Sequence, residues 1–250
     1  MYFNKTQCSV ASLVFLSAFT MTSSFAGSMG EVNRFFKGHF LVELGGYSAV
    51  QGKAQHISLQ QNLVGNAYTV TTRNQGSGVV GLGYLLDGPD IKGFPFSYGI
   101  NAFFLGQTSV SGYIVEEEDA TNLAYRYRLQ SIPVFFEAKT IVKTKSDKFK
   151  LAFDAGIGPN FMSASRYREM TLTPYTLPDT AFSDRNNVNF AVTAGASVRV
   201  HDAPGQLPIE CGYRFFYLGQ GSFTINNSQA LNAIKTGDNY ANALICTVTI

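Results

Sequence analysis

Residues 188–200 read VNFAVTAGASVRV, and they alternate strictly between two kinds of side chain. Every even position is apolar, whereas the odd positions hold no large apolar side chain and end on Arg199. Successive side chains of an extended strand point to opposite faces, so a strict period of two predicts a β-strand with one apolar face. A helical period would put Val188 and Arg199 on one stripe, which excludes an amphipathic helix. The strand alone does not say whether its apolar face meets a protein core or lipid.

The same alternation recurs in seven further segments, so the chain is expected to form eight strands. They cover residues 40–47, 79–86, 97–104, 125–138, 150–157, 188–200, 207–217 and 240–250. The connections alternate between short turns near 87–90, 143–148 and 201–206 and longer polar segments near 51–76, 112–121, 163–187 and 219–238. Short turns at one end and long loops at the other are typical of an up-and-down antiparallel barrel in an outer membrane.

Glycines indicate which face of these strands looks inward. Charged residues and eight glycines share the less apolar face, among them Gly45, Gly81 and Gly195. Glycine weakens a strand, and a water-facing surface gives no reason for it, whereas the narrow interior of an eight-stranded barrel needs small residues beside large ones. The apolar face is therefore expected to meet lipid. The sequence predicts an all-β fold, an eight-stranded antiparallel up-and-down transmembrane β-barrel.

Residues 1–26 have the three-part pattern of a secretory signal peptide. Lys5 is the only charge, an apolar run follows, and Ser24 and Ala26 form a small-x-small cleavage pattern. We therefore expect a signal peptide at 1–26 and an outer-membrane β-barrel domain at 27–250, exported to the bacterial outer membrane. With a net charge of +2 and 14% charged residues, the chain offers no basic surface for nucleic acid.

The segment at 125–138 changes its phase halfway. In residues 125–130 the apolar side chains stand at odd positions, which places Arg126 and Arg128 on the inner face, whereas in residues 131–138 they stand at even positions. Pro133 cannot donate to a ladder and is typical of bulges. The sequence therefore predicts a bulge near residues 131–132 that resets the alternation.

Two short segments carry a resemblance to a known family. SIPVFFEAK at 131–139 and ECGYRFFYLG at 210–219 resemble the later strands of small outer-membrane β-barrels of the OmpA transmembrane-domain type. The resemblance covers nearly all of residues 27–250, as a pattern rather than as a residue-specific motif. It implies a structural or surface role and insertion by the barrel-insertion machinery. Barrels of this family usually end on an aromatic residue, whereas this sequence ends on Ile250.

Eight charged residues are expected to face the lumen: Glu43, Arg126, Arg128, Lys150, Asp154, Arg199, Glu210 and Arg214. Buried charges need partners, because an isolated one costs several kcal/mol. We predict a pairing network that plugs the lumen. Loose filling by hydrated charges is the alternative.

Cys211 and Cys246 are the two cysteines of residues 27–250. Both are expected near the inner ends of the last two strands, on the lipid-facing side. An even number of cysteines in an oxidising compartment permits a disulfide. Two separate thiols in contact with lipid are an equally open alternative, because barrel shear can stagger the two residues.

Candidate catalytic residues are few. His39 and His201 are expected at the inner rim, and His56 is expected in the first external loop with Ser58 as its nearest companion. No Cys/His spacing is typical of a metal site, and no cofactor is expected. The acidic run at 116–119 is expected to be a solvated loop tip, with divalent cations bridging to lipopolysaccharide as the alternative.

These observations favour a non-enzymatic surface protein with a structural, adhesive or antigenic role, carried by long external loops. The alternatives are a narrow pore for small solutes and, less favoured, a lipid-modifying outer-membrane enzyme that uses His56. The expected partners are outer-membrane lipid and lipopolysaccharide, the barrel-insertion machinery, and a host or surface ligand bound by the external loops. No motif identifies that ligand.

Overall fold

A computed structural model describes residues 37–60, 63–91, 93–116, 119–144, 149–200, 207–227 and 229–250. The expected signal peptide at 1–26, His201 and two of the acids at 116–119 lie outside these residues, so those interpretations stay predictions. No helix within the described ranges is long and apolar enough to cross a membrane.

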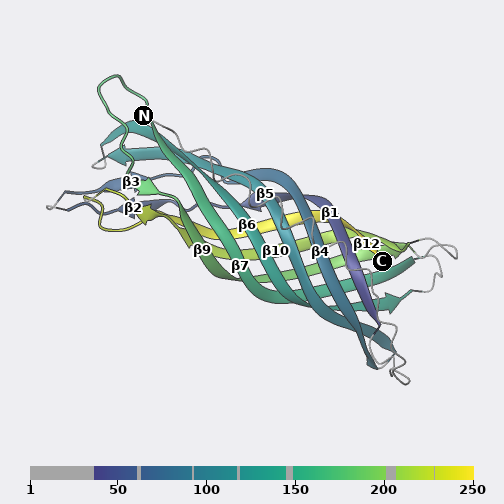
Figure 1. Ribbon diagram of the computed structural model, residues 1–250. Coiled ribbons are helices and arrows are strands. Elements are labelled where there is room, and N and C mark those ends of the chain that lie inside the picture. Colours follow the sequence, from purple (N-terminus) through teal and green to yellow (C-terminus); the bar gives the residue numbers. More distant parts are fainter. Residues whose placement is uncertain are drawn as a thin grey trace, which may run out of the picture. The chain divides into compact units, whose positions relative to one another are not determined.

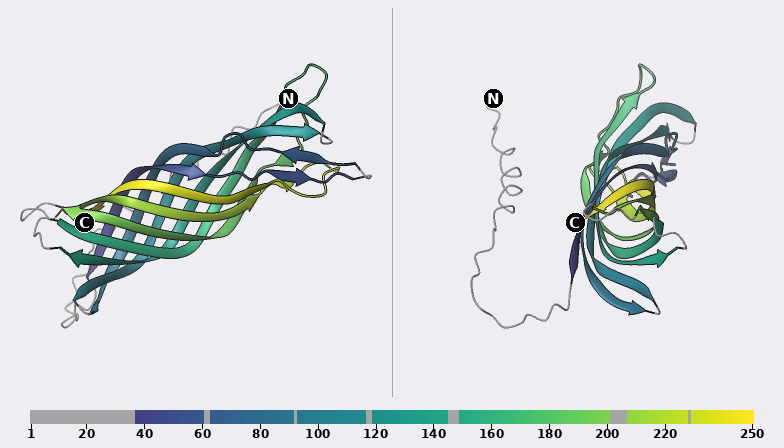
Figure 2. Two further views of the ribbon diagram at one scale, coloured as in Figure 1. Left: turned by 180° about the vertical axis from the view of Figure 1, so that it is seen from behind. Right: turned by 90° about the vertical axis from the view of Figure 1, so that its right-hand side faces the viewer.

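Eight long antiparallel strands form a closed sheet, which confirms the predicted barrel (Figure 1). They are β1 (Gly38–Val50), β4 (Asn74–Ile91), β5 (Phe94–Glu116), β6 (Ala120–Lys143), β7 (Phe149–Thr171), β9 (Arg185–Val200), β10 (Ile209–Ser222) and β12 (Lys235–Thr249). The sheet closes because β1 pairs with β12 on one side and with β4 on the other. The strands run diagonally around the barrel, as Figure 2 shows from behind.

Four short strands lie at the barrel end that carries the longer connections. They are β2 (Gln55–Ile57), β3 (Asn66–Tyr68), β8 (Phe182–Ser183) and β11 (Thr224–Ile225). β3 pairs with both β2 and the end of β5, and β8 pairs with β11. We call this end the outer end and the opposite one the inner end.

Three strands are much longer than a membrane crossing requires. β5, β6 and β7 have 23, 24 and 23 residues, whereas a crossing takes about 9–11. The predicted loop at 112–121 is wrong for this reason, because β5 continues to Glu116 and β6 begins at Ala120. Their ladder extends past any membrane thickness and forms part of the outer end.

Strand β6 keeps one alternation from Leu123 to Lys139. Its buried positions there are Leu123, Tyr125, Tyr127, Leu129, Ser131, Pro133, Phe135, Glu137 and Lys139. The predicted bulge near residues 131–132 is therefore wrong. The extra residues are in the two neighbours instead, between Leu105 and Thr108 of β5 and beside Arg166 of β7. Arg166 has a φ of 55°, the only positive φ of a non-glycine residue in the described ranges.

The chemistry of the two faces inverts halfway along β6. Below Ser131 the outward side chains are apolar, as at Phe136, and the inward ones include Glu137. Above it the inward side chains are aromatic, as at Tyr125, and Arg126 is exposed on the outside. The barrel therefore has a membrane zone, which is polar inside and apolar outside, and an outer zone with a water-facing wall around an apolar core.

An apolar band surrounds the membrane zone. Its exposed side chains come from every long strand and include Phe40, Leu44, Leu82, Ile100, Phe104, Ile132, Phe136, Phe153, Ile157, Phe161, Phe190, Val198, Ile209, Tyr213 and Leu244. A continuous exposed surface of this kind marks contact with lipid or with another protein. The predicted orientation of the apolar face is correct for this zone.

Candidate functional site

Arg214 of β10 is the centre of a buried ion-pair cluster in the membrane zone. Its Nη1 donates to Glu137 Oε2 at 2.8 Å, and its Nη2 lies 2.9 Å from Asp154 Oδ1 and 3.4 Å from Glu43 Oε1. The three carboxylates come from three other strands, β1, β6 and β7. One guanidinium with a 6% exposed side chain thus joins walls on all sides of the lumen.

Neutral groups complete this cluster. Asn101 Nδ2 donates to Glu43 Oε2 at 2.8 Å and to Glu137 Oε2 at 3.1 Å, and Thr247 Oγ1 donates to Glu43 Oε1 at 3.1 Å. The Arg214 guanidinium also lies 4.9 Å from the centre of the Phe103 ring. Buried carboxylates are stable only when their oxygens are bonded in this way.

A second cluster lies on the inner side and is centred on Glu210. Lys139 Nζ contacts its Oε2 at 2.6 Å, Arg199 Nε contacts its Oε1 at 2.6 Å, and the Ser197 hydroxyl donates to Oε2 at 3.2 Å. Glu210 is 1% exposed. This cluster has two cations and one acid, whereas the Arg214 cluster has one cation and three acids.

The structure distributes the predicted lumen charges unevenly. Glu43, Asp154 and Arg214 meet in one cluster and Arg199 and Glu210 in the other. Lys150 lies at the start of β7, half-buried, and has no ion pair with a described residue.

Arg126 and Arg128 were predicted in the lumen, and that prediction is wrong. Arg126 is exposed on the outer wall, and Arg128 donates to Gln107 there. The wall meets water at this height, so polar residues stand outside and aromatic ones inside. Sequence reasoning also missed Glu137, Lys139 and Asn101. The even-position apolar phase of residues 131–138 already places Glu137 and Lys139 inward.

Two inward glycines make room for the charged cluster. A Cβ on Gly81 would lie 2.7 Å from Glu43 Oε2 and from the Phe103 ring, and one on Gly195 would lie 2.6 Å from Asp154 Oδ1. Real Cβ atoms do not approach neighbours so closely. The glycines of the inner face therefore fit the network as well as the narrow lumen.

Aromatic layers close the lumen above the charges. Phe103, Phe135 and Phe216 pack with ring centres 5.1–6.1 Å apart and are at most 1% exposed. A second layer in the outer zone joins Tyr125, Tyr127, Tyr167, Phe182 and Phe223. Two ion-pair clusters and two aromatic layers thus fill the interior one above another.

A disulfide bond joins Cys211 and Cys246. The two residues are direct partners in the β10–β12 register, so no stagger separates them. Both side chains are exposed on the outward face, within the apolar band. The alternative of two separate thiols does not describe this structure.

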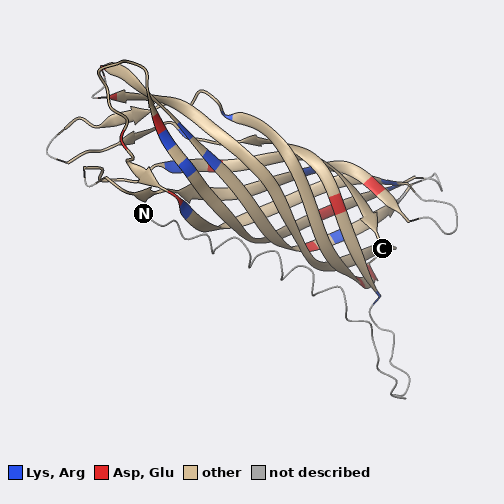
Figure 3. Cartoon of the chain, turned by 45° about the horizontal axis from the view of Figure 1, so that its top comes forward, with Lys and Arg blue, Asp and Glu red and all other residues tan. Residues whose placement is uncertain are grey.

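Arginines gather on the outer wall, just above the apolar band. Arg126 of β6 stands directly opposite Arg168 of β7, and Arg128 and Arg166 lie beside them. None of the four has an ion pair with a described residue. Figure 3 shows these basic positions grouped on adjacent strands near the outer end. We call Arg126, Arg128, Arg166 and Arg168 the arginine patch.

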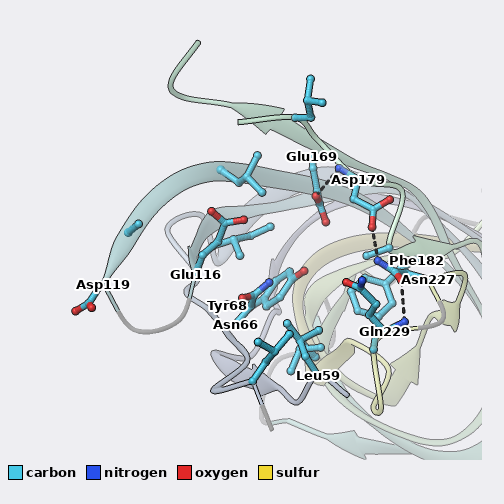
Figure 4. Close-up of a pocket in the computed structure, with 18 residues that line it drawn as sticks. Leu59, Asn66, Tyr68, Glu116, Asp119, Glu169, Asp179, Phe182, Asn227 and Gln229 are labelled. Atoms are coloured by element: carbon cyan, nitrogen blue, oxygen red, sulfur yellow. Dashed lines mark hydrogen bonds between the residues drawn. The ribbon is translucent and has the colours of Figure 1, made fainter. Parts of the chain in front are cut away.

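A cavity of about 530 Å³ opens at the outer end. β2, β3 and the outer ends of β5, β6 and β7 form its walls, together with the segments around 177–182 and 227–230. Its polar lining includes Glu116, Asp119, Glu169 and Asp179, and most of the remaining lining is apolar. Figure 4 shows Tyr68 and Phe182 in the middle of the lining, with Glu116 and Glu169 beside them. We call this the outer cavity.

Glu169 is the most enclosed of the four acids in the outer cavity. It accepts hydrogen bonds from the Tyr167 hydroxyl at 2.5 Å and from the Asp179 backbone N–H at 3.0 Å. It lies in the outer zone, beyond the membrane-spanning part of β7. Burial raises the pKa of its carboxyl above the ordinary value, against the lowering effect of these two hydrogen bonds.

The two histidines that the structure describes, His39 and His56, bond to no hydroxyl or thiol side chain. His56 Nε2 contacts the backbone oxygen of Val64 at 2.7 Å, and the backbone N–H of Ser58 donates to Asn232. His39 pairs with Asp87 at the inner end at 3.1 Å. In the described ranges no three His, Cys, Asp or Glu side chains are grouped to hold a metal ion.

The fold is an eight-stranded antiparallel β-barrel. No family model matches the sequence, and no curated protein matches it. Similar solved structures include Neisserial surface protein A, with 12% identity, a TM-score of 0.41 and coverage of 86% of this chain and 99% of that one.

Two other similar structures are the outer membrane protein OprG from Pseudomonas aeruginosa and the outer membrane protease OmpT from Escherichia coli. OprG has 11% identity, a TM-score of 0.46 and coverage of 85% of this chain and 96% of its own. OmpT has 9% identity, a TM-score of 0.40 and coverage of 92% and 98%. At these identities the likeness is one of fold alone.

Proposed function

We propose that this protein is a non-enzymatic surface-binding barrel of the bacterial outer membrane, with a lumen that does not conduct. The observation that carries the proposal is the filled lumen, in which two ion-pair clusters and two aromatic layers lie one above another. A sealed interior leaves the outer end, with its cavity, as the place where the barrel meets other molecules.

The apolar band supports the membrane location. Its exposed phenylalanines and leucines would promote aggregation in water, whereas they are stable in contact with lipid chains. The disulfide fits an oxidising compartment such as the one that the expected signal peptide leads to. A chain of this kind depends on the barrel-insertion machinery for its assembly.

Current recordings in planar bilayers test the sealed lumen. We expect no steady openings from the purified barrel under conditions where a general porin, added as a control, conducts. Steady nanosiemens-scale openings would instead support the narrow pore and contradict the proposal. Folding of the barrel is checked by its shift on unheated SDS gels.

A lack of enzymatic activity is supported by the surroundings of His56. Its ring bonds to a backbone oxygen rather than to a carboxylate or a hydroxyl that could act as a nucleophile. The test is to express the protein in a host and to compare its lipid A with that of a His56→Ala strain. A modification that depends on His56 would refute this part of the proposal.

Lipopolysaccharide is the proposed partner of the arginine patch. Arg126 and Arg168 are direct cross-strand partners. Two like charges in such a pair destabilise a sheet, and an anion bound between them removes that repulsion. The patch stands at the outer edge of the apolar band, where the phosphates of an outer leaflet lie. Arginine suits phosphate groups because its planar donors bind two oxygens at once.

The partner is tested by measuring the lipopolysaccharide that is retained by the purified barrel. The double variant Arg126→Gln/Arg168→Gln is expected to retain several-fold less, while Lys235→Gln, an exposed cation elsewhere at the outer end, retains the wild-type amount. Vesicles with phosphatidylglycerol in place of lipopolysaccharide distinguish a general anion effect. Equal retention by all three proteins would exclude the patch as the contact.

A further inference from the structure

We propose that the outer cavity binds a small organic cation, an ammonium group carried on an aromatic or similarly compact apolar body. The proposal rests on the surface-binding function above and names the ligand class for it. A volume of about 530 Å³ lies within the range of small-molecule sites, which are mostly apolar with a few placed polar groups. Four features of the lining select the class.

The first feature is an apolar floor. Ile57, Ile114 and Leu123 line the cavity and are at most 4% exposed, so they belong to the barrel's outer core. Leu63 and Leu177 stand at the rim and are 44% and 89% exposed. The exposed apolar surface is that of the two leucines, and an apolar body that covers them removes it from water, whereas a fully hydrated ion does not.

The second feature is the charge of the lining. Glu116, Asp119, Glu169 and Asp179 all line the cavity, and no lysine, arginine or histidine of the described residues does. None of the four acids has an ion pair with a cation in the described ranges. The acids therefore repel an anionic ligand and attract a cation.

The third feature is the fixed orientation of the acids. Glu169 is held by the Tyr167 hydroxyl and by the N–H of Asp179, and Glu116 accepts from Asn122 Nδ2 at 3.3 Å. Each carboxylate keeps lone pairs free for a further donor, because a carboxylate can accept about four hydrogen bonds. A site with pre-placed acceptors loses little conformational entropy when an ammonium binds.

Two aromatic rings lie between the floor and the acids. Tyr68 and Phe182 both line the cavity, with ring centres 6.2 Å apart in an edge-to-face arrangement. Both side chains are 3% exposed, so they belong to the packed apolar wall of the cavity. The apolar wall and the acidic rim therefore suit the two halves of the ligand.

Binding of three matched probes tests the proposal. They are phenethylammonium, the neutral 2-phenylethanol and the anionic 3-phenylpropionate, titrated against the full barrel in lipid nanodiscs, with empty nanodiscs as the blank. We expect the ammonium to bind about tenfold or more tightly than either other probe, which corresponds to about 1.4 kcal/mol. Equal binding of all three probes would overturn the proposal, because the cavity would then recognise only the apolar body.

Matched variants locate the site. Glu116→Gln/Glu169→Gln keeps the shape and removes two charges, and it should weaken ammonium binding about tenfold or more. Asp238→Asn removes one charge at the outer end of β12, outside the cavity, and should bind as the wild type does. Unchanged binding by the first variant, shown to be folded by gel shift, would place the ammonium elsewhere and refute the inference.

Two further outcomes keep this inference separate from the proposed function. Conductance in planar bilayers with normal ammonium binding would refute the sealed lumen and leave the ligand class standing. A lumen that does not conduct, together with no preference for the ammonium, would refute the ligand class and leave the sealed lumen standing. Full displacement of the ammonium by millimolar Mg²⁺ would show that the acids hold a metal ion, which would overturn the organic cation as the ligand.

Discussion

At the scale of single residues, Arg214 and its carboxylates differ in what their loss would do. Removing Arg214 leaves Glu43, Glu137 and Asp154 buried together without a cation. Removing the charge of Glu137 leaves Arg214 with two partners and lowers the repulsion among the acids. A buried ion pair is costly to break from one side only, so the two substitutions are expected to have very unequal effects.

We predict that Arg214→Met lowers the free energy of unfolding by about 3–5 kcal/mol, whereas Glu137→Gln lowers it by less than about 1 kcal/mol. Urea titrations of the barrel in lipid vesicles, followed by circular dichroism, provide the measurement. Tyrosine fluorescence serves as a second probe, since the chain has 13 Tyr and no Trp. Equal losses in the two variants would show that the cluster does not depend on its cation.

Glu169 gives a residue-scale prediction on pH. Its raised pKa means that it takes up a proton at a higher pH than an ordinary carboxylic acid does. The groups that face it are Tyr167, Tyr68, Asp179 and Glu116, and none is a cation, so only the two hydrogen bonds favour the ionised carboxylate and burial outweighs them.

Phenethylammonium binding should therefore weaken as the pH falls through the raised pKa of Glu169, and it should be fully present only above it. In Glu169→Gln this early loss should disappear, and the remaining dependence should follow the ordinary carboxylates of the rim. Titrations of the probe at a series of pH values measure both proteins. A pH profile that is the same in wild type and variant would assign the dependence to another group.

At the scale of elements, β6 shows how the environment of a strand changes along its length. Phe136 is 59% exposed toward the apolar band, and Ala124 stands on the same face of the same strand in the outer zone. An arginine at a lipid-facing position in the middle of the membrane lowers the free energy of unfolding far more than one at a water-exposed position does. The boundary that we place near Ser131 can therefore be measured.

We predict that Phe136→Arg lowers the free energy of unfolding by about 2–4 kcal/mol, and that Ala124→Arg changes it by less than about 1 kcal/mol. Both variants introduce the same arginine side chain, so they compare its cost at the two heights. Unfolding in vesicles of fixed lipid composition gives the comparison. A large loss from Ala124→Arg would move the membrane boundary outward and contradict the two-zone description.

The same element shows how far the sequence predicts this fold. Period-two alternation identified all eight long strands and the correct inner face of seven, because side-chain direction in a strand depends only on position. For residues 125–130 the alternation is correct, but the predicted inner and outer faces are exchanged: the odd positions point inward and Arg126 points outward. Alternation says which residues share a face, and it does not say whether lipid or water lies outside.

The sequence predicts the ion-pair cluster better than the outer cavity, because alternation along a strand fixes which side chains point inward. Glu43, Asp154 and Arg214 stand at inward positions of strands in the membrane zone, so their place in the lumen could be predicted. The outer cavity could not be predicted, since Tyr68, Glu169 and Phe182 meet only through the folding of β2, β3 and β8 over the barrel end. Their sequence separations carry no periodic signal.

At the scale of the whole molecule, the two zones require a fixed orientation across the membrane. The longer connections, the arginine patch and the outer cavity all lie at one end, and short connections lie at the other. Figure 1 shows β2 and β3 at the outer end. If the proposed surface function is correct, that end faces the medium and the short turns face the periplasm.

Single engineered cysteines can decide this orientation, because both cysteines of the barrel are already joined in the disulfide. Val64→Cys replaces a 54% exposed residue beside β3, and Phe94→Cys replaces a 43% exposed residue at the inner start of β5. A membrane-impermeant maleimide applied to intact cells should label the first variant and leave the second unlabelled, and permeabilised cells should label both. Labelling of Phe94→Cys alone in intact cells would mean that the outer cavity faces the periplasm, and the binding partner would then have to be sought inside the envelope.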